Sequence, residues 1–361
     1  MPILVPKKVG ASMSSNEDLK WSLDTQTLDE VAPQRLAWLW PEKIPAGKIT
    51  LFSGNPDCGK TTLLSDLIAR FTSGRPWPDQ TANHSNEYTH GPRRSVLLLN
   101  AEDDLADTLV PRLHAAKAVL RLIHIASGAR LQNCQPPSFI GLDNLEPIEQ
   151  KLRDHPEIAL MVVDPIQSYL GEGDLNKEQS VRAILTPLAE LAAKHEVTII
   201  LNSHLSKRGD VNALHRVGGA VALSAVSRAA WLICRDHEDK TLHRMLLAKG
   251  NLSRKRTGMK FRINSVETSV GSQPVIGWEG PDETDVEDAV RQPERESKLD
   301  QAIAFLEQYL TEPRLARDVE ANALKHGIGE RTLASAKQKL SIKSSKRAGK
   351  WFWEKAKDAN E

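Results

Sequence analysis

The sequence predicts an α/β fold with a mainly parallel sheet, and three observations lead to this prediction. Apolar runs of strand length alternate with helical patterns between Leu28 and Val275, an order typical of α/β proteins. Several of these runs are apolar without alternation, as expected of strands that are covered on both faces. The first of them leads directly into a glycine-rich loop, "GNPDCGKT".

The main domain is predicted over residues 21–278, after a flexible segment at 1–20 and before an acidic linker at 279–297. The linker combines acidic residues with few large apolar side chains. The predicted strands are 48–54, 95–101, 121–127, 158–164, 197–203, 229–235 and 243–249, and the predicted helices include 59–73, 145–154 and 178–195.

Residues 298–361 are predicted to form a separate small domain of the winged-helix type. Three helical segments precede the stretch "IKSSKRAGKWFWEK", which we interpret as a hairpin on which Trp351 and Trp353 share a face and pack onto the helices. Between Glu330 and Lys357 there are nine Lys or Arg against two acids, a local charge of +7. This indicates nucleic-acid contact by Lys337, Lys346 and Arg347; the alternative is a protein-interaction module with a solvated basic face.

Composition excludes several classes of protein. The net charge of +1 gives no overall attraction to nucleic acid or membrane, so any such attraction must be local. No apolar run is long enough to span a bilayer, and the N-terminus lacks the apolar region of a signal peptide. Three scattered cysteines suit a reducing compartment. We therefore expect a cytoplasmic protein without a membrane partner.

The loop between strand and helix fits the Walker A pattern G-x-x-x-x-G-K-[ST]. Its backbone N–H groups and the following helix N-terminus are suited to phosphates. Lys60 is expected to reach the β- and γ-phosphates of ATP, Thr61 to bind Mg²⁺, and Thr62 to touch the α-phosphate. The full predicted nucleotide site comprises Gly54, Asn55, Pro56, Asp57, Cys58, Gly59, Lys60, Thr61 and Thr62.

Two acidic residues complete the predicted chemistry. Asp164 ends the apolar strand "LMVVD", as in a Walker B motif whose carboxylate holds Mg²⁺. Many P-loop ATPases have a glutamate directly after this aspartate, which orients the attacking water. Here Pro165 follows Asp164, so another residue is expected to orient the water. Glu102, in "LLLNAEDD", ends another strand, where a carboxylate would face the ligand crevice. The alternative is a solvated turn acid beside Asp103 and Asp104.

With these motifs in place, the chain resembles the RecA-like hexameric ATPases, in particular plasmid RepA helicases and the helicase part of phage primase–helicases. The matching stretches include "WLWPEKIPAGKITLFSGNPDCGKTTL", "LLLNAEDD", "MVVDPIQSYLGEG", "TIILNSHLSKR" and "RVGGAVALSAVSRAAWLI", in the family's order over about 21–265. The resemblance implies a RecA-like P-loop core, ATP and Mg²⁺ as cofactors, and a homo-oligomeric ring, expected to be a hexamer.

The resemblance also implies roles for individual residues. Glu102 matches the catalytic glutamate and His204 a polar sensor of the γ-phosphate. Arg228 matches an arginine finger that acts on the neighbouring subunit's nucleotide, and Lys249 a second cation acting in the same way. His204, Arg228 and Lys249 each have an alternative: a structural histidine, a surface ion-pair partner and a solvated strand-end charge, respectively.

Single-stranded DNA is the expected polymer partner. In the family, the loops equivalent to 171–182 and 205–217 line the ring's pore, which makes Lys177, Lys207 and Arg208 candidate phosphate contacts. A replication initiator or a primase is a further possible partner.

The predicted function is an ATP-driven DNA helicase or translocase in the replication of a phage, plasmid or mobile element. The alternatives are a RecA/RadA-like recombination ATPase and a DNA-binding regulator whose oligomeric state is switched by ATP.

Overall fold

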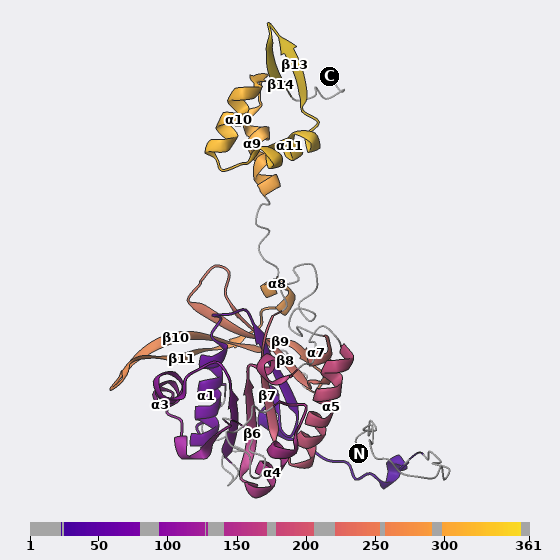
Figure 1. Ribbon diagram of the computed structural model, residues 1–361, viewed down its shortest axis with the longest axis vertical. Helices are drawn as coiled ribbons and strands as arrows, with labels where there is room; N and C mark the ends of the chain where they lie inside the picture. The colour runs from indigo at the N-terminus through magenta and orange to yellow at the C-terminus, as the bar shows by residue number, and fades with distance from the viewer. Residues whose placement is uncertain are drawn as a thin grey trace. The chain divides into compact units, whose positions relative to one another are not determined.

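The computed structural model describes residues 23, 25–79, 94–126, 128, 141–171, 178–205, 221–252, 257–290 and 298–354 (Figure 1). The chain consists of two compact units, and the boundary between them lies between Val290 and Arg291. The predicted flexible segment at 1–20 lies outside the described residues.

A nine-stranded sheet forms the centre of the first unit, in the order β11-β10-β9-β8-β3-β7-β6-β4-β5. The strands from β8 to β5 run parallel, and β9, β10 and β11 add antiparallel pairs at one edge. Their bounds are β3 Ile49–Gly54, β4 Ser95–Asn100, β5 Ile123–Ala126, β6 Ile158–Asp164, β7 Thr198–His204, β8 Ala229–Arg235, β9 Leu242–Gly250, β10 Gly258–Thr268 and β11 Gly271–Asp282.

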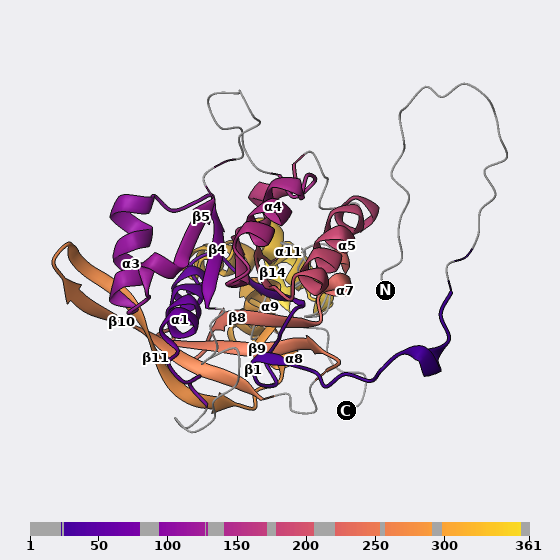
Figure 2. The same cartoon turned by 90° about the horizontal axis from the view of Figure 1, so that it is seen from below.

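Helices cover both faces of this sheet, which explains why its central strands are apolar without alternation (Figure 2). One face packs against α1 (Lys60–Ser73) and α3 (Val110–Ala115), and the other against α4 (Glu146–Asp154) and α5 (Glu178–Lys194). Within β3, Leu51 belongs to the core on one face and Phe52 to the core on the other. The predicted α/β class with a mainly parallel sheet is confirmed.

Shorter elements connect these layers. They are the ladder of β1 (Trp38–Trp40) with β2 (Ile44–Pro45), helix α7 (Val221–Val226), helix α8 (Val286–Val290), 3₁₀ turns at Leu28–Glu30, Leu120–Leu122 and Ile166–Tyr169, and a π-helical turn at Leu105–Leu109. The indole N–H of Trp77, which follows α1, donates to the Leu39 carbonyl in β1. The indole N–H of Trp231 on β8 donates to the Lys43 carbonyl between β1 and β2, and this bond attaches the β1–β2 ladder to the sheet.

The predicted boundary at 278–279 falls inside an element of the first unit. Strand β11 continues to Asp282, which pairs with Gly258 of β10. The buried Asp282 carboxylate accepts hydrogen bonds from Arg244 at 2.7 and 2.9 Å. Helix α8 then occupies 286–290. The acidic composition that favours a linker therefore belongs, up to Val290, to ordered structure whose key acid is neutralised by an arginine.

The second unit consists of three helices and a three-stranded sheet in the order β12-β14-β13. Its elements are α9 (Lys298–Tyr309), β12 (Arg314–Leu315), α10 (Ala316–Lys325), α11 (Glu330–Lys339), β13 (Lys343–Arg347) and β14 (Lys350–Glu354). As the sequence predicts, three helices precede a hairpin formed by the stretch that contains Trp351 and Trp353. The two tryptophans of β14 differ, however, because Trp353 is 7% exposed in the core whereas Trp351 is 55% exposed.

Candidate active site

Four predicted functional segments meet at the carboxyl ends of neighbouring parallel strands. Strand β3 pairs with β7 so that Gly54 lies opposite His204, and β4 pairs with β6 so that Asn100 lies opposite Asp164. Because β6 and β7 are also parallel neighbours, the carboxyl ends of all four strands lie together. Ligands of open α/β sheets bind at this edge.

The P-loop depends on two glycines for different reasons. Gly59 has a φ of +87°, and a Cβ there would lie 2.7 Å from Cδ1 of Ile263. A Cβ on Gly54 would lie 2.2 Å from the carbonyl oxygen of Ile233. Gly59 therefore provides a left-handed turn, and Gly54 allows the loop to leave the sheet directly beside β8.

The Lys60 ammonium lies inside the loop and is almost fully buried. Its Nζ donates to the carbonyl oxygens of Gly54 at 3.0 Å and Asn55 at 2.8 Å. The side chains of Asn55, Pro56 and Asp57 are exposed. A buried ammonium surrounded by loop backbone is the arrangement that suits a polyphosphate.

Two residues that the sequence analysis did not single out support the P-loop from outside. Arg235, at the end of β8, donates to the Asp57 carbonyl at 2.6 Å. Nδ1 of the buried His243, on β9, lies 3.0 Å from the Cys58 carbonyl oxygen, so Nδ1 is the protonated nitrogen. Burial lowers the pKa of His243 and Arg235 lowers it further, partly opposed by the hydrogen bond to Cys58. No sequence pattern links these residues to the loop; the sheet order alone brings them there.

Asp164 is the buried acid of the site, with 4% of its surface exposed. Burial raises the pKa of Asp164, the carboxylates of Glu102 and Asp103 raise it further, and hydrogen bonds from Asn202 and Thr61 lower it. A carboxylate and a hydroxyl are hard oxygen ligands that suit Mg²⁺. A divalent cation would also offset the charge of the clustered carboxylates, so the residues present fit this ion.

Glu102 and His204 face each other, with Nε2 of His204 3.6 Å from Oε1 of Glu102. The two acids that follow Glu102 have structural partners. Asp103 forms an ion pair with Arg112 at 2.5 Å, and Asp104 caps the next helical turn by accepting from the backbone N–H of Ala106. Glu102 is thus the acid of this trio that faces the strand ends, and half of its side chain is exposed.

Polar atoms near this pair are available for a ligand. Among the described residues, Nδ1 of His204, Oε1 of Gln167 and Oδ1 of Asn202 are buried without a hydrogen-bond partner. Nε2 of Gln167 donates to Ser203 at 2.9 Å. Buried polar atoms are normally satisfied in folded proteins, so this cluster is consistent with a polar ligand at the strand ends.

Arg228 and Lys249 lie at the opposite end of the parallel strands, where β3 and β8 begin. The Arg228 backbone N–H donates to the carbonyl of Ile49, the first residue of β3, which is about 16 Å along the strand from Gly54. Lys249 pairs with Ala230 at the start of β8. Its Nζ donates to the carbonyls of Ser224, Ala225 and Ser227 at 2.5, 3.0 and 3.1 Å, at the C-terminal end of α7. Burial lowers the pKa of Lys249, and the charge of Arg228 contributes.

Of the predicted DNA contacts, Lys177, Lys207 and Arg208 lie outside the described residues. The other three belong to the second unit. Nζ of Lys337 lies 2.6 Å from Oγ of Ser344 and 4.1 Å from the Trp353 ring centroid. Arg347 pairs with Glu354, and Nζ of Lys346 lies 5.9 Å from the Trp351 ring centroid.

Together, the sheet order, the P-loop and the acids Glu102 and Asp164 at the strand ends define a P-loop nucleotide-binding ATPase. The chain matches the model of the AAA domain family over residues 16–210, more than half of its length, and therefore belongs to this family. That range includes Lys60, Glu102, Asp164 and His204. No curated protein matches the chain. Among the described residues, no helix has both the length and the apolar character needed to cross a membrane.

Proposed function

We propose that this protein is an ATP-driven DNA helicase or translocase that works as a ring of identical subunits. The observation that carries the proposal is the separation of the two sets of predicted catalytic residues. Lys60, Glu102 and Asp164 lie at the carboxyl ends of the parallel strands, and Arg228 lies at their amino ends. An arginine at the amino ends of the strands is too far from the P-loop to contact the nucleotide of its own subunit, but it can contact the nucleotide of a neighbouring subunit.

In this proposal the P-loop binds ATP through its backbone N–H groups and Lys60. Thr61 and Asp164 would hold Mg²⁺, which supplies positive charge next to the phosphates. Glu102 accepts a proton from the attacking water and orients it. His204, within 3.6 Å of Glu102, links the state of this carboxylate to the segment after β7, where DNA contacts by Lys207 and Arg208 are proposed.

We further propose that the second unit is a winged-helix domain that binds DNA. Its element order, with a helix, a short strand, two helices and a hairpin, supports this assignment. Helix α11 would be the recognition helix and β13–β14 the wing. The context would be replication of a phage, plasmid or mobile element.

The test is steady-state ATP hydrolysis by the full chain with and without single-stranded DNA, followed by strand displacement on a forked duplex. The proposal expects hydrolysis to rise several-fold with DNA and expects ATP-dependent unwinding. Arg228→Ala should abolish the stimulated rate. Arg153→Ala, which removes an exposed arginine paired with Glu149 on α4, is the matched control and should leave it unchanged.

The competing function is a DNA-binding regulator that ATP switches between oligomeric states. The separate basic unit favours it, because such a unit binds DNA without needing a motor. Slow hydrolysis that is insensitive to single-stranded DNA, together with an ATP-dependent change in oligomeric mass, would support the regulator and contradict the helicase.

A further inference from the structure

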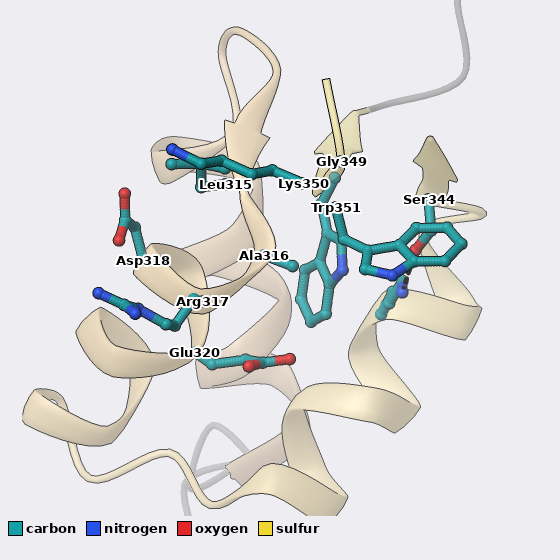
Figure 3. A pocket seen from close by; sticks show the side chains of 11 residues that line it. Leu315, Ala316, Arg317, Asp318, Glu320, Ser344, Gly349, Lys350 and Trp351 are labelled. Carbon is teal, nitrogen blue, oxygen red and sulfur yellow. Dashed lines mark hydrogen bonds between the residues drawn. The ribbon is translucent and has the colours of Figure 1, made fainter. Parts of the chain in front are cut away.

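A cavity of about 600 Å³ lies in the second unit, between the start of α10, the last turn of α11 and the β13–β14 hairpin (Figure 3). Its size falls within the range of small-molecule sites. Ala316 and Glu320 contribute from α10, and Ser344, Lys350 and Trp351 from the hairpin. This cavity lies entirely within one compact unit.

The hairpin side of the cavity is aromatic. Trp351 and Trp353 are two residues apart on β14, so both project from the same face of the strand. Trp353 is buried in the core of the unit, whereas more than half of Trp351 is exposed. An exposed tryptophan beside a cavity offers a flat apolar surface on which a planar ligand can stack.

The surroundings of Trp351 are basic. The hairpin from Lys343 to Glu354 contains four Lys or Arg and one acid, of which Arg347 pairs with Glu354. Lys343, Lys346 and Lys350 are exposed, and Nζ of Lys346 lies 5.9 Å from the Trp351 ring centroid. These cations suit phosphates on either side of a stacked group.

The floor of the cavity offers both a donor and an acceptor. Nζ of Lys337 lies beside Ser344 and over the ring of Trp353. Glu320 turns its carboxylate toward the hairpin, whereas Arg317 and Asp318 point to the other side (Figure 3). A ligand that fits this cavity has a planar face, an edge with hydrogen-bonding groups and flanking negative charge.

We propose that this cavity holds an unstacked base of single-stranded DNA, with Trp351 against the base and Lys346 and Lys350 near the flanking phosphates. The proposal rests on the DNA-binding part of the proposed function and specifies its polymer. In a duplex both faces of each base are stacked, so the Trp351 surface selects single strands.

The first experiment is photo-crosslinking of the full chain to single-stranded DNA that carries 5-iodouracil, followed by mass spectrometry. The proposal expects a crosslink at Trp351 that disappears in Trp351→Ala. Crosslinks confined to other peptides, or an equal crosslink at Trp351 from the same sequence as a duplex, would overturn it.

The second experiment measures affinity for labelled oligothymidylate by fluorescence anisotropy at several salt concentrations. Trp351→Ala should weaken binding about tenfold with little change in salt dependence, and Trp351→Phe should retain most of the affinity. Lys346→Ala should lower the salt slope by about one. Leu324→Ala, which removes another exposed apolar side chain of this unit, is the control and should bind as the wild type does. Equal binding by Trp351→Ala contradicts the proposal.

These outcomes separate the two proposals. If DNA stimulates hydrolysis but no crosslink forms at Trp351, the base site fails and the motor stands. If the Trp351 crosslink forms but hydrolysis ignores DNA, the base site stands and the motor fails.

Discussion

At the scale of single residues, the three consecutive acids after β4 have separate structural surroundings. Asp103 is paired with Arg112, Asp104 caps a helical turn, and Glu102 faces His204. Sequence alone leaves Glu102 open to an interpretation as a solvated turn acid. The partners of its two neighbours favour the catalytic interpretation instead.

Glu102→Gln should therefore reduce ATP hydrolysis by at least about a hundredfold, the usual contribution of a general base. Binding of ATP should persist, because the P-loop is untouched. Asp104→Asn is the matched control, since asparagine caps a helix as well as aspartate does. Single-turnover hydrolysis and nucleotide binding measure the two effects, and equal loss of hydrolysis in both variants would contradict the assignment.

His243 leads to a pH prediction. Its pKa lies below the ordinary value near 6.5, chiefly because the ring is buried. As pH falls through about 6.5, the unfolded chain takes up a proton that the folded protein does not. The contribution of His243 is therefore complete above this pH and declines as pH falls toward the folded-state pKa.

The free energy of unfolding should accordingly decrease between pH 7.5 and pH 5.5, an interval set about the ordinary histidine pKa. His124, whose pKa is also lowered by burial, acts in the same direction. His243→Asn should flatten this dependence while lowering stability overall. Urea denaturation across this interval measures the slope, and identical slopes for the two proteins would be evidence against the prediction.

At the scale of elements, the P-loop is shaped by strands that come much later in the chain. Ile263 of β10 and Ile233 of β8 pack against Gly59 and Gly54, while His243 of β9 binds the Cys58 carbonyl. The loop conformation thus depends on the antiparallel edge of the sheet as well as on its own glycines.

Gly59→Ala tests this dependence. The substitution adds left-handed strain, about 1–3 kcal/mol, and a contact of the new Cβ with Ile263. Gly271→Ala, at the first residue of β11, adds the strain alone, because a Cβ there meets nothing within 4 Å. We expect Gly59→Ala to be the more destabilising and to lose ATP binding, measured by thermal unfolding and by nucleotide titration. An equal loss of thermal stability in the two variants would show that the contact with Ile263 adds nothing to the strain.

At the scale of the whole molecule, the two sets of predicted catalytic residues lie at opposite ends of the parallel strands. Closed rings of identical subunits bring opposite surfaces of neighbours together. A complete site is therefore expected only where one subunit supplies Glu102 and the next supplies Arg228.

Mixing two inactive variants tests this arrangement. Glu102→Gln lacks the base and Arg228→Ala lacks the finger, yet in a mixed ring about one interface in four combines both intact residues. Hydrolysis should reappear when the two proteins are mixed and subunits exchange. A mixture that stays inactive although mixed oligomers form would contradict a shared site.

The sequence by itself determined the α/β class, the positions of the parallel strands, the P-loop and the acids at strand ends, because period, apolar runs and loop glycines are local features. It also located the three C-terminal helices and their hairpin. Tertiary structure alone decided which distant residues support the P-loop, that ordered structure continues to Val290, and that Trp353 is buried while Trp351 is exposed. These outcomes depend on strand order and on packing between segments far apart in the chain, which no local pattern encodes.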